Sequence, residues 1–182
     1  MPLHTQTVDL GAALEEKRAE KDDVAEQAAE LDPDNPAFER LARRGNTLDT
    51  HIDALEWACR EWDVDQITLA GMTGGEVAKM ENELAEDGSG PGDARIATVV
   101  HGTEAAPYLH DDDAATYAAV GQLPYAVQAW VEDEVNALTE PSGNGAPAMA
   151  ETDDSASLTF GELLAEKRHE RAGPDSDGSS GS

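Results

Sequence analysis

The chain has 182 residues, with 39 Asp and Glu against 12 Lys and Arg, so its formal net charge at pH 7 is −27. This length fits one domain, or a small domain with extensions. The charge argues against direct binding to nucleic acid or to an anionic membrane, because phosphate binding requires clustered Lys and Arg. No run of about 18 apolar residues occurs, and the first residues lack the pattern of a signal peptide. The single cysteine, Cys59, excludes an internal disulfide and a multi-cysteine zinc site.

Scarce apolar side chains and scarce lysine allow two interpretations of this acidity. Leu, Val, Ile and Phe together number 30 of 182 residues, a composition that with high net charge is typical of disorder. Only four lysines accompany eight arginines, and high Asp and Glu with small apolar residues resembles the proteins of salt-in halophiles. Molar salt shortens the Debye length to about 3 Å and screens self-repulsion. We favour a haloarchaeal source over an acidic, partly disordered mesophilic protein.

Two apolar seams predict an antiparallel helical hairpin in residues 1–63. Residues 1–8 are expected to be an unstructured lead, followed by helices over about 9–31 and 36–62. In both helices the inward positions alternate in steps of three and four residues, as in a heptad pattern. The two seams are Leu10, Leu14, Lys17, Lys21, Val24, Ala28 and Leu31, then Phe38, Leu41, Gly45, Leu48, Ile52, Leu55, Cys59 and Trp62. The alternative is two separate amphipathic helices packed on another element.

The middle of the chain, residues 64–140, predicts a small helical domain. Residues 66–69 are a short strand or an extended connector, and Thr73 with Glu76 matches a capping box that begins a helix. Further helices are expected over about 94–100, 114–120 and 124–139. The overall fold class is therefore mainly all-α, with a helical hairpin followed by a small helical domain.

The last part, residues 141–182, predicts a flexible acidic tail with a disordered linker over 141–157 and one short helix over 158–171. This helix repeats a pattern of the first helix. Residues 11–20 align without gaps on residues 161–170 and share Gly-x-x-Leu-x-Glu-Lys-Arg-x-Glu. The repeat reflects either a common helix-forming composition or two segments that dock on similar surfaces.

No residue pattern predicts catalysis, a cofactor or a metal ion. His101, His110 and Asp111–Asp113 lack the spacing of a metal site, and the Asp run suits a helix start. The glycines of residues 71–75 lack a phosphate-loop signature, and Cys59 is expected to be buried in its seam. We therefore expect a non-enzymatic protein without cofactor or metal.

The candidate partner-binding residues lie on the second predicted helix. Trp57 falls off the apolar stripe, so we expect it to be exposed, and exposed tryptophans often anchor interfaces. Leu48, Ile52 and Leu55 are the seam residues expected to contribute to the same contact with a protein partner.

The segments 67–76, 102–109 and 123–136 resemble proteins encoded by haloarchaeal tailed viruses and proviruses. The layout is also similar to that of tail assembly chaperones, although the N-terminal hairpin is a departure. This resemblance implies a virion assembly or structural protein that binds tail or virion proteins and forms a homo-oligomer. It also implies a location in the cytoplasm of an archaeal host, with association to the virion. The alternative is a halophilic cellular coiled-coil adaptor or regulatory protein, in which the two similar helices permit self-association or autoinhibition.

Overall fold

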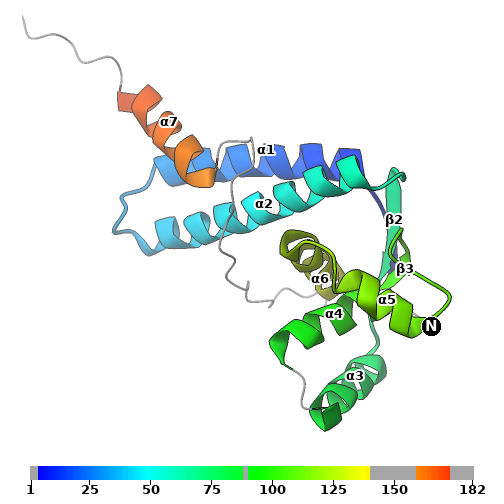
Figure 1. The fold of residues 1–182 in the computed structure, drawn as a ribbon. Helices are drawn as coiled ribbons and strands as arrows, with labels where there is room; N and C mark the ends of the chain where they lie inside the picture. Colours follow the sequence, from blue (N-terminus) through cyan, green and yellow to red (C-terminus); the bar gives the residue numbers. More distant parts are fainter. Residues whose placement is uncertain (1–3, 88–89, 140–158, 173–182) are drawn as a thin grey trace, which may run out of the picture.

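The computed structural model describes residues 4–87, 90–139 and 159–172, and most of these residues are helical (Figure 1). The mainly all-α fold class is therefore confirmed. Three short strands in this part of the chain form one antiparallel sheet in the order β1-β2-β3. Their bounds are Thr5–Asp9 for β1, Gln66–Ala70 for β2 and Thr103–Ala105 for β3.

The strand β1 corrects the expectation of an unstructured lead, which is wrong for residues 5–8. Thr7 of β1 stands opposite Thr68 of β2, and within β1 only Val8 is buried. A polar segment of this kind carries little strand signal of its own, so pairing with β2 fixes its conformation. β3 was not expected either, because three residues are too few to show an alternating pattern.

The predicted antiparallel hairpin is confirmed, with α1 over Leu10–Ala29 and α2 over Pro36–Glu61. Asp9 caps α1 by accepting a hydrogen bond from the Ala12 N–H at 2.9 Å, and Asn35 caps α2 in the same way. Most seam positions are buried or half-buried, as predicted. The prediction for Cys59 is wrong, because its side chain is exposed near the end of α2.

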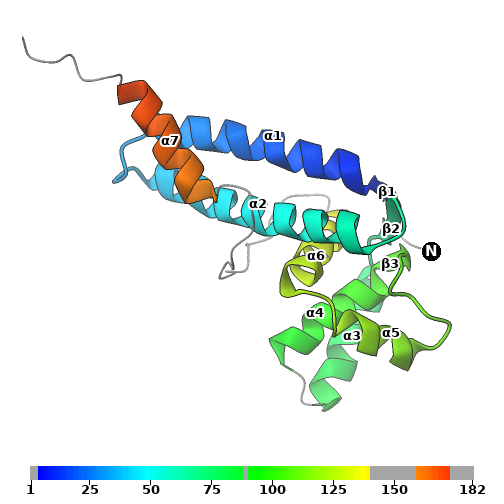
Figure 2. The ribbon, with the colours of Figure 1, turned by 45° about the horizontal axis from the view of Figure 1, so that its top comes forward.

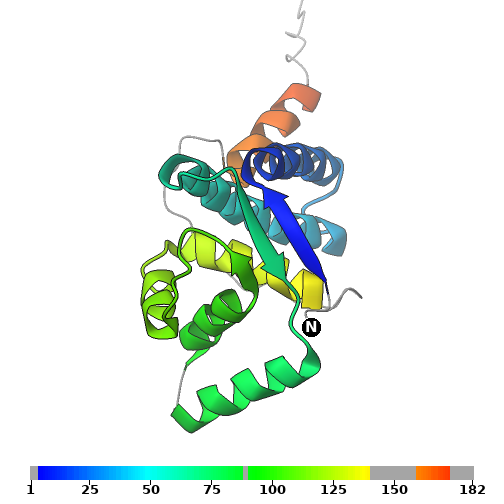
Figure 3. The same cartoon turned by 90° about the vertical axis from the view of Figure 1, so that its right-hand side faces the viewer.

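Among the described residues, four helices come between β2 and the C-terminal helix, and in Figure 3 they lie below the hairpin. The expected capping box is present, since Thr73 N–H donates to Glu76 at 2.7 Å and Glu76 N–H donates to Thr73 Oγ1 at 3.3 Å. The helices are α3 over Gly74–Asp87, α4 over Pro91–His101, α5 over Asp113–Val120 and α6 over Tyr125–Thr139. None of the described helices is long and apolar enough to cross a membrane.

The main core fills the space between the sheet, the adjoining half of the hairpin and helices α3 to α6. Its fully buried members come from many elements, including Leu55 of α2, Leu69 of β2 and Trp130 of α6. Strands from residues 1–63 and 64–140 pair in one sheet, and α2 packs on α6. These two ranges therefore share one core in the structure.

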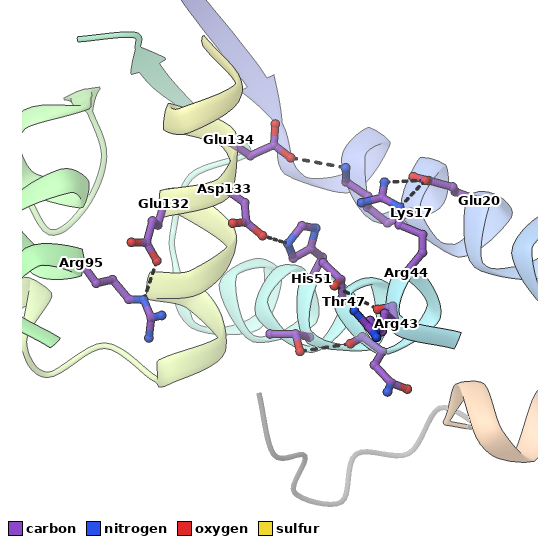
Figure 4. A network of polar contacts seen from close by, with 12 residues as sticks. Lys17, Glu20, Arg43, Arg44, Thr47, His51, Arg95, Glu132, Asp133 and Glu134 are labelled. Carbon is purple, nitrogen blue, oxygen red and sulfur yellow. Dashed lines mark hydrogen bonds and ion pairs between the residues drawn. The ribbon is translucent and has the colours of Figure 1, made fainter. Parts of the chain in front are cut away.

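Three consecutive acidic residues of α6 contact three different helices (Figure 4). Glu132 pairs with Arg95 of α4 at 2.6 Å, and Glu134 pairs with Lys17 of α1 at 3.4 Å. Asp133 lies between them and contacts the buried His51 of α2, with 2.9 Å between Oδ2 and Nε2. Because side chains turn by about 100° per residue on a helix, α6 joins α4, α2 and α1 at one level.

The predicted C-terminal helix is present as α7, Phe160–Ala172, and packs on α1 and α2. It covers the half of the hairpin next to the α1–α2 turn, which we call the tip, whereas α6 contacts the half near the sheet (Figures 1 and 2). The predicted disordered linker, 141–157, and residues 173–182 lie outside the described residues.

Candidate protein-binding site on the helical hairpin

The first residue of α7 is the main anchor of this helix on the hairpin. Phe160 is only 2% exposed and packs with the buried Val24, Ala25, Ala28 and Leu48 in a small second core. Its ring lies directly over Gly45, where an added Cβ would overlap three ring carbons. The glycine in the seam of α2 therefore makes a notch that accepts one aromatic ring.

A buried ion pair lies beside this notch. Phe160 N–H donates to Asp49 Oδ2 at 2.7 Å, and Asp49 Oδ1 pairs with Lys21 Nζ of α1 at 2.6 Å. The side chains of Lys21 and Asp49 are only 7% and 10% exposed. The first N–H groups of a helix lack partners within it and carry partial positive charge, so a carboxylate suits this position. Asp49 therefore binds the first N–H of α7, while the notch at Gly45 accepts its aromatic side chain.

The start of α7 is capped from within the segment, whereas its later part contacts the hairpin. At its start, Thr159 N–H donates to Glu162 at 2.8 Å, and this hydrogen bond is the largest cause that lowers the pKa of Glu162. Further along, Arg168 donates to the Leu31 carbonyl oxygen at 3.3 Å, and its guanidinium lies 4.9 Å from the centre of the Phe38 ring. The Arg168 contacts hold α7 near the α1–α2 turn.

The repeated sequence pattern corresponds to a repeated mode of docking. α1 and α7 each follow a polar cap residue, Asp9 or Thr159, and each begins with a buried apolar residue, Leu10 or Phe160. The two anchors enter different cores, because Leu10 packs near the sheet and Phe160 packs at the tip. Both segments thus bury the first apolar residue of their helix, α1 in the main core and α7 in the tip core.

The residues chosen from the sequence as partner-binding lie mostly in the core of this chain. Leu48, Ile52 and Leu55 are at most 1% exposed. A partner reaches them only if the helices around them separate, although Leu48 lies directly beneath Phe160 in the tip core. Trp57 is half-buried rather than exposed and contacts Trp62 edge-on, with 5.8 Å between the ring centres.

The residues considered for metal or anion binding have local structural contacts. His101 Nε2 lies 3.1 Å from the Tyr117 hydroxyl, and Asp112 accepts the Ala115 N–H at the start of α5. Gly71 packs so closely on the backbone of Leu138 that an added Cβ would overlap the carbonyl oxygen. Within residues 4–87, 90–139 and 159–172, no group of three or more His, Cys, Asp or Glu is placed to hold a metal ion.

The sequence analysis missed Asp49 and Phe160 of this site, and it placed Gly45 and Lys21 only as seam positions. Gly45 gave a usable signal, since it is the smallest residue in an otherwise large-residue seam and a small residue admits a bulky partner. Phe160 lies far away in the sequence, so no spacing rule connects it to Gly45. Comparisons with protein-family models, with curated proteins and with solved structures found no match for this chain.

Proposed function

We propose that this protein has no catalytic activity and acts by binding other proteins, as an assembly protein of a haloarchaeal tailed virus. The observation that carries the binding role is the way the hairpin binds the start of α7. The notch at Gly45 accepts the ring of Phe160, and the Asp49 carboxylate accepts its N–H. The viral assignment rests on the resemblance of the segments 67–76, 102–109 and 123–136. It implies tail or virion proteins as partners and a place in the host cytoplasm or on the virion.

The placement of charge supports a protein adapted to high salt. Residues 64–140 contain 2 Lys and Arg against 15 Asp and Glu, a net charge of −13. Several of the scarce cationic side chains join different helices, among them Arg95 to Glu132, Arg18 to Glu56 and Arg44 to Glu20. Self-repulsion of this size favours the unfolded state at low ionic strength and is screened in molar salt.

The direct test uses the full chain at two salt concentrations. Light scattering after size exclusion, with circular dichroism, is compared at about 3 M and about 0.15 M KCl, where screening differs several-fold. We expect a helical protein with a defined oligomer or complex only at high salt. Cross-linking in infected host cells should then join the hairpin to tail or virion proteins. A helical monomer at both salts that is absent from particles and assembly intermediates would contradict the proposal.

A second candidate is a halophilic cellular adaptor whose binding is regulated by its own C-terminal segment. The docking of α7 on the hairpin favours it, because a segment that occupies a binding surface also controls access to that surface. The two candidates differ in one observable. A virion assembly protein is found with virus particles or their precursors, whereas the cellular adaptor is present and bound to its partner in cells without virus.

A further inference from the structure

We propose that the surface under α7 at the hairpin tip is a docking site for the start of a partner's helix, and that α7 competes with the partner for it. This surface consists of Val24, Ala25, Ala28, Gly45, Leu48 and Asp49. This inference rests on the proposed protein-binding function and adds the chemistry of the partner and the regulation of the site. The partner helix has a polar cap residue and then an aromatic residue at its first position.

The fold allows α7 to leave without loss of the main core. Among the described residues, α7 contributes one buried side chain, Phe160, and that side chain belongs to the small tip core. The capping box of Thr159 and Glu162 lies within α7 and its cap, so it travels with the helix. Release breaks the hydrogen bond from Phe160 N–H to Asp49 and the one from Arg168 to Leu31.

The surface beneath α7 specifies what replaces it. Val24, Ala25, Ala28 and Leu48 form an apolar floor, and the notch over Gly45 gives room for one ring. Asp49 keeps its ion pair with Lys21 but loses its N–H donor. A carboxylate is stabilised by the positive start of a helix and repelled by the negative end. The site therefore favours a helix that enters by its N-terminus with an aromatic residue first.

The covalent connection between α6 and α7 sets the affinity that a partner needs. Because α7 belongs to the same chain as the hairpin, its docking is intramolecular and does not depend on the protein concentration. A free helix of the same intrinsic affinity is therefore at a disadvantage when it is dilute. A partner present at low concentration must bind more tightly than α7, so α7 excludes weak ligands from the site.

The test uses full-length variants in high salt and a fluorescent peptide of residues 159–172, with anisotropy as the readout. Phe160→Ala in the protein removes the anchor of α7 and leaves the site open. We therefore expect this variant to bind the peptide at least tenfold more tightly than the unmodified chain does. Gly45→Ala fills the notch, so this variant should not bind. Alanine is also the better helix former, so α2 is expected to stay folded in Gly45→Ala, which circular dichroism checks.

Two controls distinguish specific binding through the phenylalanine ring from nonspecific binding of the peptide. The peptide with alanine in place of its phenylalanine should bind none of the proteins. Gly161→Ala places a methyl group where the nearest atom, Thr159 Oγ1, is 4.0 Å away, and it favours the helical form of α7. This variant should bind the peptide more weakly than the unmodified chain, because its own helix competes better.

Each contrary result has a definite meaning. Equal peptide binding by the unmodified chain and Phe160→Ala would overturn the role of α7 as competitor. Peptide binding by Gly45→Ala as tight as by Phe160→Ala would overturn the notch as the docking site. If the variants still cross-link to tail or virion proteins as the unmodified chain does, the proposed function stands without this site. If no protein partner is found for any of them, the proposed function itself fails.

Discussion

The two halves of the hairpin are stabilised in different ways. Near the sheet, α1 and α2 share a large core with two strands and the four helices α3 to α6, and the buried residues include Trp130 and Tyr108. At the tip, four buried residues of α1 and α2 are completed by one buried side chain from α7, Phe160. The sheet half therefore holds the fold together, whereas the tip half depends on a segment that joins it from the far end of the chain. We assign stability to the first and binding to the second.

The largest expected effect comes from the core near the sheet. Trp130 is fully buried, so Trp130→Ala should lower the free energy of unfolding by about 3–5 kcal/mol, as deletions of large core side chains do. Urea denaturation in high salt, followed by circular dichroism, measures this change. The matched substitution at the tip, Phe160→Ala, should lower it by less than Trp130→Ala does, because it removes only the docking free energy of α7, for which a tenfold change in peptide affinity corresponds to about 1.4 kcal/mol. Equal losses for the two variants would show a single cooperative core.

The next largest effect tests the buried ion pair at the tip. Lys21→Met leaves the Asp49 carboxylate buried without its cation, and breaking one side of such a pair costs about 3 kcal/mol or more. Unfolding in urea gives the loss. The double variant Lys21→Met with Asp49→Leu should regain most of this stability while it removes the acceptor of the Phe160 N–H. A double variant as unstable as the single one would mean that the charges are needed for folding.

A smaller effect is expected where α6 joins the hairpin. Asp133→Ala leaves His51 without the partner of its Nε2, and its Nδ1 already has no hydrogen-bond partner among the described atoms. Loss of a partner for a buried polar group costs about 1–3 kcal/mol. The control is Glu134→Gln on the next residue, which weakens a pair with Lys17, whose side chain is more exposed than that of His51, and should cost less than about 1 kcal/mol. A larger loss of stability for Glu134→Gln would show that the pair with Lys17, and not the contact of Asp133 with His51, stabilises the packing of α6 on the hairpin.

The smallest effect is a pH dependence confined to α7. The hydrogen bond from Thr159 N–H lowers the pKa of Glu162 below that of an ordinary glutamate. A carboxyl group whose pKa is lowered on folding stabilises the folded form above its unfolded pKa, and this contribution disappears as the pH falls through the lowered value. The protection of α7, taken as its exchange rate relative to the intrinsic amide exchange rate at the same pH, should therefore fall more between about pH 5 and about pH 3 in the unmodified chain than in Glu162→Gln, because this range extends below the unfolded pKa of about 4.3.

The matched group for this pH prediction is Glu76, which forms the same capping box with Thr73 at the start of α3. Glu76→Gln should change the pH dependence of exchange in α3 and leave that of α7 unaltered. If Glu162→Gln and the unmodified chain show the same pH dependence in α7, the capping box of Thr159 does not contribute to its docking.

The regular parts of the fold could be predicted from the sequence, and the site could not. Leu10, Val24 and Ile52 lie at repeating positions, so the helices and the side on which they pack follow from local spacing. The strand β1 has no such pattern, because its conformation depends on pairing with β2 some sixty residues later. The contact of Phe160 with Gly45 and Asp49 is also set by tertiary packing. The sequence contained each partner but no signal that connected them.

Hydrogen exchange in high salt tests the central claim most directly. The exchange of residues 160–172 in α7 is compared with that of residues 125–139 in α6, in the unmodified chain and in Trp130→Ala. We predict that α7 exchanges through a local opening whose free energy is the same in both proteins, whereas the protection of α6 falls with global stability. If α7 and α6 lose protection together in Trp130→Ala, α7 is part of one cooperative unit, and the account of a separable helix on a docking site is wrong.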